Sequence, residues 1–316
     1  MTAVVGTNFQ IFNTGYGIGV TSPMIVQLMG NLVDDQSTSW FASSLVIGQV
    51  FGSFLGSHLA NTLGRKRTII LSALFSMISW SLLASSQFYW MLILGRVLTG
   101  FFDCLSLAGG AMFVAEVSET KYKGSFINST CIFSGMGIAF GYLFGSNLHW
   151  RFSCFVSVTA SFLSVASLIL CHESPVFLMM KNQTARDCLH WYRQLIFETK
   201  ESEQELEREL KQIESEVSMT GGGLVEAIRK LMDSSNRRAF FIVGVLFMFF
   251  PLTGIYNISF FAVDLFNKLE LGGAEVVAVM TALVRCLGTC CSSLLLLRYE
   301  SVSPFLYLLE QGIDHK

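Results

Sequence analysis

The sequence predicts an all-α integral membrane protein, because of its composition and the length of its apolar runs. Of its 316 residues, 52% are hydrophobic and only 14% are charged, whereas soluble proteins carry about 25% charged residues. The apolar residues gather in runs of roughly 20, a length that crosses a ~30 Å hydrocarbon core at about 1.5 Å per helical residue. A bilayer is therefore the expected solvent for most of the chain, and the composition indicates no nucleic-acid partner.

Apolar runs that end at charges or turn residues define eight candidate spans. The first is the least apolar, because it carries Asn8, Gln10, Asn13 and Thr14 among its glycines. Such a helix is expected to face other helices and a hydrated cavity rather than lipid. The expected spans are 4–29, 39–60, 68–87, 91–114, 125–145, 152–171, 240–266 and 272–297.

Basic residues predict how these spans are oriented. They gather in the loops 61–67 and 115–124 and in the segment 172–239, while the intervening loops are nearly free of them. Loops rich in lysine and arginine tend to stay in the cytoplasm. These three segments and both termini are therefore expected on the cytoplasmic side.

The segment 172–239 differs from the rest of the chain because it is rich in both acids and bases. Residues 198–216 read ETKESEQELERELKQIESE, and a second short helix is expected at 224–232. The apolar residues of the first helix recur at helical spacing, at Leu206, Leu210 and Ile213. We interpret the segment as a cytoplasmic helical domain whose charged helix is solvated and supported by i,i+4 pairs, without a ligand.

Three short motifs lie at the ends of the expected spans. They are Gly64-Arg65-Lys66-Arg67 after span two, Gly95-Arg96 with Gly100, Glu116-Val117-Ser118 and Lys123-Gly124 in span four and its exit, and Glu173-Ser174-Pro175 after span six. Their order and spacing resemble the sugar porters of the major facilitator superfamily, and the chain looks most similar to the insect trehalose-transporter branch. The resemblance covers residues 10–298. It implies a complete N-terminal six-helix bundle and two helices of a C-terminal bundle.

The resemblance also implies a function and a set of gating residues. Sugar porters move a sugar across the membrane by alternating access, in which two bundles close in turn on a site at the midplane. By this resemblance, Arg65 and Lys66 pair with Glu116 near Lys123, and Glu173 joins the same network. The alternative is that the basic residues only set the topology. The motif residues expected to gate are Gly64, Arg65, Lys66, Arg96, Glu116, Lys123 and Glu173.

The expected substrate cavity departs from the family pattern. The two amides of span seven are replaced within residues 250–256, the glutamine position of span five is Cys131, and the asparagine position of span eight is Arg285. Other polar side chains remain that can hydrogen-bond to sugar hydroxyls. The candidate substrate-binding residues are Asn13, Thr14, Cys131, Thr253, Tyr256, Asn257 and Arg285.

Two charges, Asp103 and Arg285, fall near the middle of expected spans. A charge that faces lipid there costs on the order of 2.5–3.5 kcal/mol on insertion scales, so both should face the protein interior. Arg285 either lines the cavity or bonds to helix carbonyls, and Asp103 either serves function or joins helices. Because residues 3–30 contain no carboxylate, the first-span aspartate of proton-coupled sugar porters is absent, and a uniporter is favoured.

Four domains are expected from these patterns: a membrane bundle at 1–171, the cytoplasmic domain at 172–239, spans seven and eight at 240–297, and a divergent cytoplasmic tail at 298–316. The family continues with four more spans where this tail begins, so the chain is expected to be truncated. The first hypothesis is a facilitative sugar or polyol transporter of the plasma membrane, with impaired activity in this chain. The alternative is a non-transporting isoform that acts as a sensor or as a partner of an oligomer or a full-length homologue.

An enzyme is not expected, because the sequence shows no histidine cluster, nucleophile elbow or carboxylate pair. Nearly all of the eight cysteines fall inside apolar runs without metal-ligand spacing. They are interpreted as small packing residues. No cofactor or metal is therefore predicted.

Overall fold

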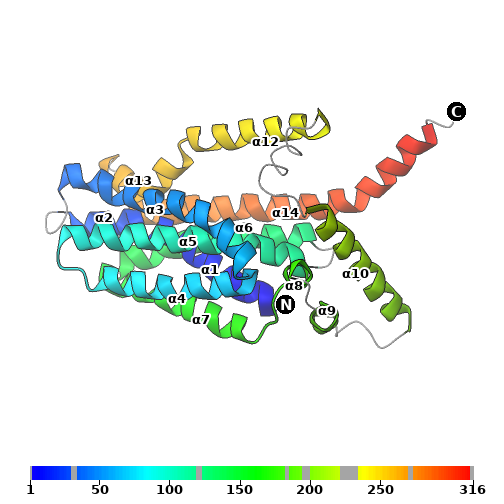
Figure 1. Cartoon of the computed structure of the whole chain (residues 1–316). Coiled ribbons are helices and arrows are strands. Elements are labelled where there is room, and N and C mark those ends of the chain that lie inside the picture. The colour runs from blue at the N-terminus through cyan, green and yellow to red at the C-terminus, as the bar shows by residue number, and fades with distance from the viewer. Residues whose placement is uncertain are drawn as a thin grey trace. The chain divides into compact units, whose positions relative to one another are not determined.

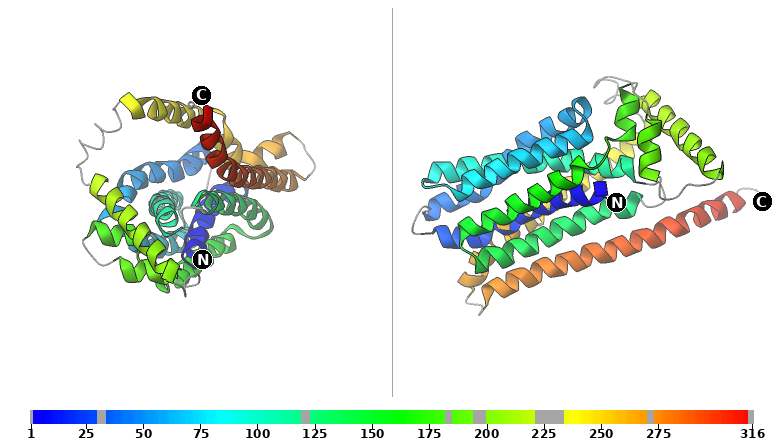
Figure 2. Two further views of the ribbon diagram at one scale, coloured as in Figure 1. Left: turned by 90° about the vertical axis from the view of Figure 1, so that its right-hand side faces the viewer. Right: turned by 90° about the horizontal axis from the view of Figure 1, so that it is seen from below.

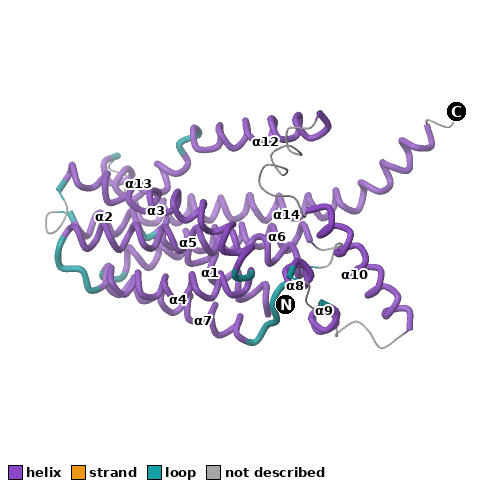
Figure 3. Tube along the Cα trace, viewed as in Figure 1, coloured by secondary structure: helices purple, strands orange, loops and turns teal. Residues whose placement is uncertain are grey.

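The structure is a computed structural model that describes residues 2–29, 34–118, 123–181, 185–193, 200–220, 234–269 and 273–313. Every regular element within these ranges is a helix, as Figure 3 shows. The chain divides into two compact units: Met1–Cys171 with Phe260–Lys316, and His172–Ser259.

The first unit is built from long helices that run side by side (Figure 1). They are α1 Thr2–Gly19, α2 Thr21–Leu28, α3 Asp35–Thr62, α4 Arg65–Ala84, α5 Tyr89–Val117, α6 Lys123–Asn147, α7 Trp150–Ile169 and α14 Ala274–Ile313. Among the described residues, six helices are long and apolar enough to cross a membrane: α3 to α7 and the Ala274–Ser292 part of α14.

Two of the expected spans are each divided into two helices. The span expected at 4–29 breaks at Val20 between α1 and α2. Pro23 lies just beyond this break and has no backbone N–H for a bond to the carbonyl four residues earlier. The span expected at 240–266 divides into α12 Ser234–Leu252 and α13 Ile255–Lys268. Gly254 lies between them with φ of 74°, a conformation that glycine adopts readily.

Close backbone contact holds the helices of the first unit together. Helix α5 packs on α3 and α4, α4 also packs on α7, and α1 packs on α5, α6 and α7 (Figure 2). A Cβ atom at Gly100 of α5 would lie 2.0 Å from the Leu45 carbonyl oxygen of α3, and one at Gly48 of α3 would lie 2.0 Å from the Val97 carbonyl oxygen. Only glycine fits at these two positions, which explains Gly100 of the span-four motif in steric terms.

Helix α14 differs from the predicted end of span eight. The sequence predicts that the helix ends at 297, whereas α14 continues to Ile313. No glycine occurs between Thr289 and Gln311, so the residue that most often ends helices is missing there. Within the membrane segment, α14 packs on α6.

The second unit contains α8 Pro175–Met180, α9 Arg186–Arg193, α10 Lys200–Thr220 and α12, together with the first residues of α13. Leu206 and Ile213 of α10 form a small apolar cluster with Leu189 of α9, and Val176 and Met179 of α8 pack against it. The charged helix therefore uses its apolar face for packing. The second helix expected at 224–232 lies outside the described residues.

Candidate functional site

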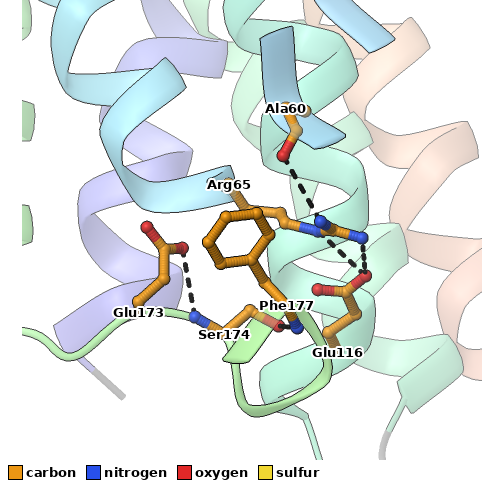
Figure 4. Close-up of polar contacts among 6 residues, drawn as sticks. All are labelled: Ala60, Arg65, Glu116, Glu173, Ser174 and Phe177. Carbon is orange, nitrogen blue, oxygen red and sulfur yellow. Dashed lines mark hydrogen bonds and ion pairs between the residues drawn. The ribbon is translucent and has the colours of Figure 1, made fainter. Parts of the chain in front are cut away.

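Arg65 and Glu116 form an ion pair between α4 and α5 (Figure 4). The Arg65 Nε and Nη2 atoms donate to Glu116 Oε1 at 3.1 and 3.0 Å, and Nη1 donates to the Ala60 carbonyl of α3 at 3.3 Å. The side chains are 4% and 16% exposed. Three helices of the first unit thus meet at one guanidinium group.

The turn before α4 places Arg65 in this position. Helices α3 and α4 are joined by two residues, and the second, Gly64, has φ of 110°. Side chains other than glycine rarely adopt this conformation. The motif glycine therefore makes a reversal tight enough for Arg65 to start α4 within reach of the end of α3.

Each partner of this pair has the unfavourable sign for its own helix end. Arg65 begins α4, where the helix dipole is positive, and Glu116 lies in the last turn of α5, where the dipole is negative. Each such placement costs about 0.3–1 kcal/mol at an exposed site. The ion pair compensates for both, so separating the two helix ends leaves each charge in an unfavourable field.

Lys66 joins α4 to the end of α7. Its Nζ atom donates to the Cys171 carbonyl at 2.5 Å and to the Ile169 carbonyl at 3.4 Å. Carbonyls at a helix C-terminus lack intrahelical partners and attract a cation. Arg65 and Lys66 thus act at different helices, while Lys123, the first residue of α6, is exposed.

The Glu173-Ser174-Pro175 motif caps the first helix of the second unit. The Ser174 hydroxyl accepts from the Phe177 backbone N–H at 3.3 Å, and Pro175 occupies the first turn of α8 (Figure 4). Serine at the cap and proline in the first turn are both favoured at helix starts. The Glu173 Oε1 atom accepts from the Ser174 backbone N–H at 3.1 Å. The expected link of Glu173 to Arg65 remains a prediction.

Cys188 of α9 is tied to the same motif. Its thiol donates to the Glu173 carbonyl at 2.8 Å. Burial, followed by the nearby Glu173 charge, raises the pKa of the Cys188 thiol to about 12. The neutral thiol therefore serves as a hydrogen-bond donor that holds α9 against the loop before α8.

Arg96 lies apart from the Arg65–Glu116 pair. It stands 20 residues before Glu116 on α5, a distance of about 30 Å along a helix. Its guanidinium group is fully buried and donates to the Gly17 carbonyl and the Thr21 hydroxyl, both at 3.1 Å. It also lies 4.6 Å from the Phe41 ring centroid. The contacts of Arg96 join α5 to α1, α2 and α3, so its grouping with the gating charges is not supported by its position.

Asn13 and Thr14 also face the interior of the first unit. The fully buried Asn13 amide donates to Ser161 Oγ of α7 at 2.9 Å and to Ser76 Oγ of α4 at 3.2 Å. Thr14 donates to the Gln10 carbonyl of its own helix at 3.3 Å. The polar face of α1 is thus used for helix packing, and the substrate contact expected of Asn13 and Thr14 remains a prediction.

The other candidate binding residues fall in both units. Cys131 of α6 is exposed, and Arg285 of α14 is half-buried. Their helices pack on one another, with the Asn128 amide of α6 donating to the Thr289 carbonyl of α14 at 3.4 Å. Thr253, Tyr256 and Asn257 belong to the second unit and are exposed. The structure therefore brings together α6 and α14, the helices that carry Cys131 and Arg285. A binding site formed by all of the candidate residues remains a prediction.

One buried polar residue was not singled out for function by the sequence. Gln10 of α1 is fully buried, and both of its amide atoms lack a hydrogen-bond partner within the described part of the chain. Its neighbours one turn away, Thr14 and Asn13, are candidate binding residues because they are polar side chains in an apolar span. Gln10 carries the same signal.

Comparison with known proteins decides the family. The family model described as "Sugar (and other) transporter" matches residues 1–299. This chain belongs to the sugar transporter family. As a member of this family it is a multi-pass membrane protein and not an enzyme. Its fold is the all-α fold of the major facilitator superfamily.

Curated relatives of this chain share about a quarter of its residues over the matched part. The facilitated trehalose transporter Tret1 of Polypedilum vanderplanki is 25% identical over 84% of this chain and 53% of that protein. The mouse solute carrier family 2, facilitated glucose transporter member 6, is 27% identical over 82% of this chain and 52% of that protein. The probable polyol transporter 4 of Arabidopsis thaliana is 28% identical over 80% of this chain and 49% of that protein. The chain spans about half the length of these relatives.

A solved structure supports the fold independently. The xylose transporter XylE of E. coli, in a partially occluded inward-open conformation, matches with a TM-score of 0.72 at 16% identity. The match covers 95% of this chain and 71% of XylE. The fold of this chain is therefore similar to that of XylE over the matched part.

Proposed function

We propose that this chain supplies the first bundle and two helices of the second bundle of a facilitative transporter for a hexose, a polyol or a disaccharide such as trehalose. The family match over residues 1–299 carries the proposal. The names of its relatives indicate hydroxyl-rich substrates. We place the protein in the plasma membrane, with both termini in the cytoplasm.

The ion pair at the end of the first bundle suits a gate. A gate contact must form and break during each cycle, so it needs a free energy of a few kcal/mol at most. A partly exposed pair of charges satisfies this requirement, since exposed pairs contribute about 0–1 kcal/mol and fully buried ones resist separation. With 4% and 16% exposure, Arg65 and Glu116 lie between these limits.

The α6 and α14 interface is the proposed position of the substrate wall. Cys131 and Arg285 replace amides in the family pattern, and an arginine offers five donors and no acceptor. A wall of this kind favours substrates that present several acceptor oxygens. Arg285→Asn is therefore expected to change the order of preference among sugars while leaving surface expression intact.

Uptake into proteoliposomes tests the proposal. The 316-residue chain is compared with a chimera in which spans nine to twelve of a family member follow Arg298, at equal protein density. We expect saturable uptake of radiolabelled sugar by the chimera and none by the chain alone, because two closing bundles are required. Arg285→Lys is the matched control for Arg285→Asn, since it keeps the charge. A folded chimera that moves no sugar would contradict the proposal and favour a non-transporting partner or sensor.

A further inference from the structure

Asp103 is a carboxyl group enclosed in the middle of the first bundle. It lies near the centre of α5 and is 0% exposed. Neither Oδ1 nor Oδ2 has a hydrogen-bond partner of good geometry within the described part of the chain, and the Ser76 hydroxyl of α4 is the polar neighbour that acts on it. Intramembrane carboxyl groups are costly and are functional candidates for that reason.

The surroundings of the carboxyl group come from three other helices. A Cβ atom at Gly17 of α1 would lie 3.4 Å from Asp103 Oδ2, 3.5 Å from Trp80 of α4 and 3.8 Å from Leu45 of α3. The carboxyl group therefore occupies the space beside a glycine, where a side chain of α1 would otherwise lie. Beside an indole, a leucine and a glycine, with the Ser76 hydroxyl as a neighbour, an ionised carboxylate has few donors to stabilise its charge.

The nearest cation, Arg96, is engaged elsewhere. It stands seven residues before Asp103 on the same face of α5, yet no ion pair within 4.0 Å joins the two among the described residues. Its Nη atoms donate to Gly17, Thr21 and Met24. Its Nε atom has no hydrogen-bond partner in the part of the chain that the structure describes. A donor is thus available on the same face as an unpaired acid.

Few other ionisable groups act on this site. Tyr16 of α1, Cys154 of α7 and Cys104 of α5 are the titratable groups that interact with Arg96 or Asp103. The remaining charged or titratable residues of the packed helices stand toward the two ends of the bundle. Toward the end that holds the Arg65–Glu116 pair they are His58 of α3, Arg65, Lys66 and Arg67 of α4, Glu116 of α5, and Lys123 and Cys131 of α6. Toward the opposite end they are Asp35 of α3, Tyr89 of α5, Tyr142 of α6 and Arg151 of α7.

We propose that Asp103 is a reversible proton-binding site of the first bundle. In the packing seen here the acid is neutral, because its carboxyl group is enclosed without a cation. A movement of α1 against α5 that frees the Arg96 side chain from the Gly17 carbonyl lets Arg96 turn toward Asp103. The carboxyl group then releases its proton to water and pairs with Arg96. Proton binding at Asp103 is a property beyond facilitative transport, which needs no proton. It makes the packing of α1 on α5 depend on pH.

Infrared spectroscopy of the purified chain in lipid nanodiscs tests the proposal without a transport assay. A protonated carboxyl group gives a C=O stretching band distinct from that of a carboxylate. We expect a band at neutral pH that shifts in D2O, that Asp103→Asn removes and that disappears reversibly as the pH is raised within the range in which the protein stays folded. Asp264→Asn is the matched control, because Asp264 is an acid of the same unit that pairs with Lys268 at 2.9 Å. It should leave the band unchanged.

Two results would overturn the proposal. One is a spectrum without any Asp103-dependent band at neutral pH, which would show a permanent carboxylate. The other is a band that persists at every pH at which the protein stays folded, which would show a fixed structural proton. Asp103→Glu keeps the acid and should move the band without removing it, so the test does not depend on the folding of Asp103→Asn. The measurement is independent of sugar flux, so its failure leaves the proposed transport function untouched.

Discussion

Exchanging the two charges of the Arg65–Glu116 pair provides a sharp test of how the first bundle closes. In the native chain both charges oppose the dipoles of their own helices, and the pair compensates for this. Arg65→Glu with Glu116→Arg places an acid at the start of α4 and a base at the end of α5. Both positions then agree with the helix dipoles. The double variant should therefore keep the pair and remove two unfavourable interactions.

The magnitudes follow from the geometry of the contact. Glu116→Gln keeps an oxygen that Arg65 can donate to but loses the charge, so we expect a loss of about 1–2 kcal/mol in stability, between the values of exposed and buried pairs. Glu116→Ala leaves a nearly buried guanidinium group unpaired and should cost about 3 kcal/mol. The exchange removes two unfavourable dipole interactions, about 0.6–2 kcal/mol together, and loses the Arg65 bond to the Ala60 carbonyl, about 1 kcal/mol. The exchanged pair should therefore recover the native stability within about 1 kcal/mol.

Thermal unfolding of the purified chain in nanodiscs, with both single variants and the double variant, measures the coupling free energy of the pair. Lys123→Glu is a control for a charge reversal at an exposed residue near the same bundle end. A double variant as unstable as the sum of the two singles would show that Arg65 and Glu116 do not interact. In that case their role would be limited to topology.

Three further predictions concern packing, reactivity and orientation. Gly100→Ala should lower the folded yield severely, because its Cβ atom would lie 2.0 Å from the Leu45 carbonyl oxygen. Gly109→Ala on the same helix should be tolerated, because its Cβ atom meets nothing nearer than 3.5 Å. Size-exclusion profiles of the two variants measure the difference in folded yield. Cys188 should resist iodoacetamide at pH 8, because the thiolate is the reactive form and the pKa of this thiol is raised to about 12. A cysteine at the exposed Ser215 should react, and equal labelling of the two by mass spectrometry would contradict the prediction. A cysteine at Asp34 should react with an impermeant thiol reagent added outside the cell and one at Gly222 only after permeabilisation, and the reverse pattern would refute the predicted orientation.

The contacts at the helix ends could be predicted from the sequence better than those inside the bundle. Arg65 and Glu116 stand out because charges are rare in this chain and because a motif places them at neighbouring helix ends. The interior contacts of Asn13 and Arg96 could not be assigned. In a membrane helix the lipid face and the packed face are both apolar, so hydrophobic periodicity does not distinguish them. On α6, for example, Phe140 is exposed while Ile138 is buried.

The helix breaks have signals in the sequence that apolar length overrides. Pro23 stands three residues after the interruption at Val20, and Pro251 and Gly254 flank the end of α12. A long apolar run predicts a single span, because length is the strongest membrane signal. Proline and glycine are tolerated in membrane helices when neighbouring groups satisfy the freed backbone atoms. The apolar length of a run therefore predicts a crossing but does not show that the crossing is one continuous helix.

The polar groups of α1 join it to two other helices of the first unit, which suits the proposed transport function. Asn8 donates to Ser129 of α6 at 3.1 Å, Tyr16 donates to the Ser153 carbonyl of α7 at 2.9 Å, and the Gly6 carbonyl accepts from Ser164 of α7 at 2.7 Å. Interhelical bonds of this kind average about 0.6 kcal/mol each in membranes. These bonds hold α1 on α6 and α7, and the glycine contacts hold α3 on α5. Alternating access by rocking, as proposed for this chain, needs helices that move as rigid groups. The contact of Arg96 in α5 with α1 and the charges at the helix ends are then the contacts that can be exchanged between states.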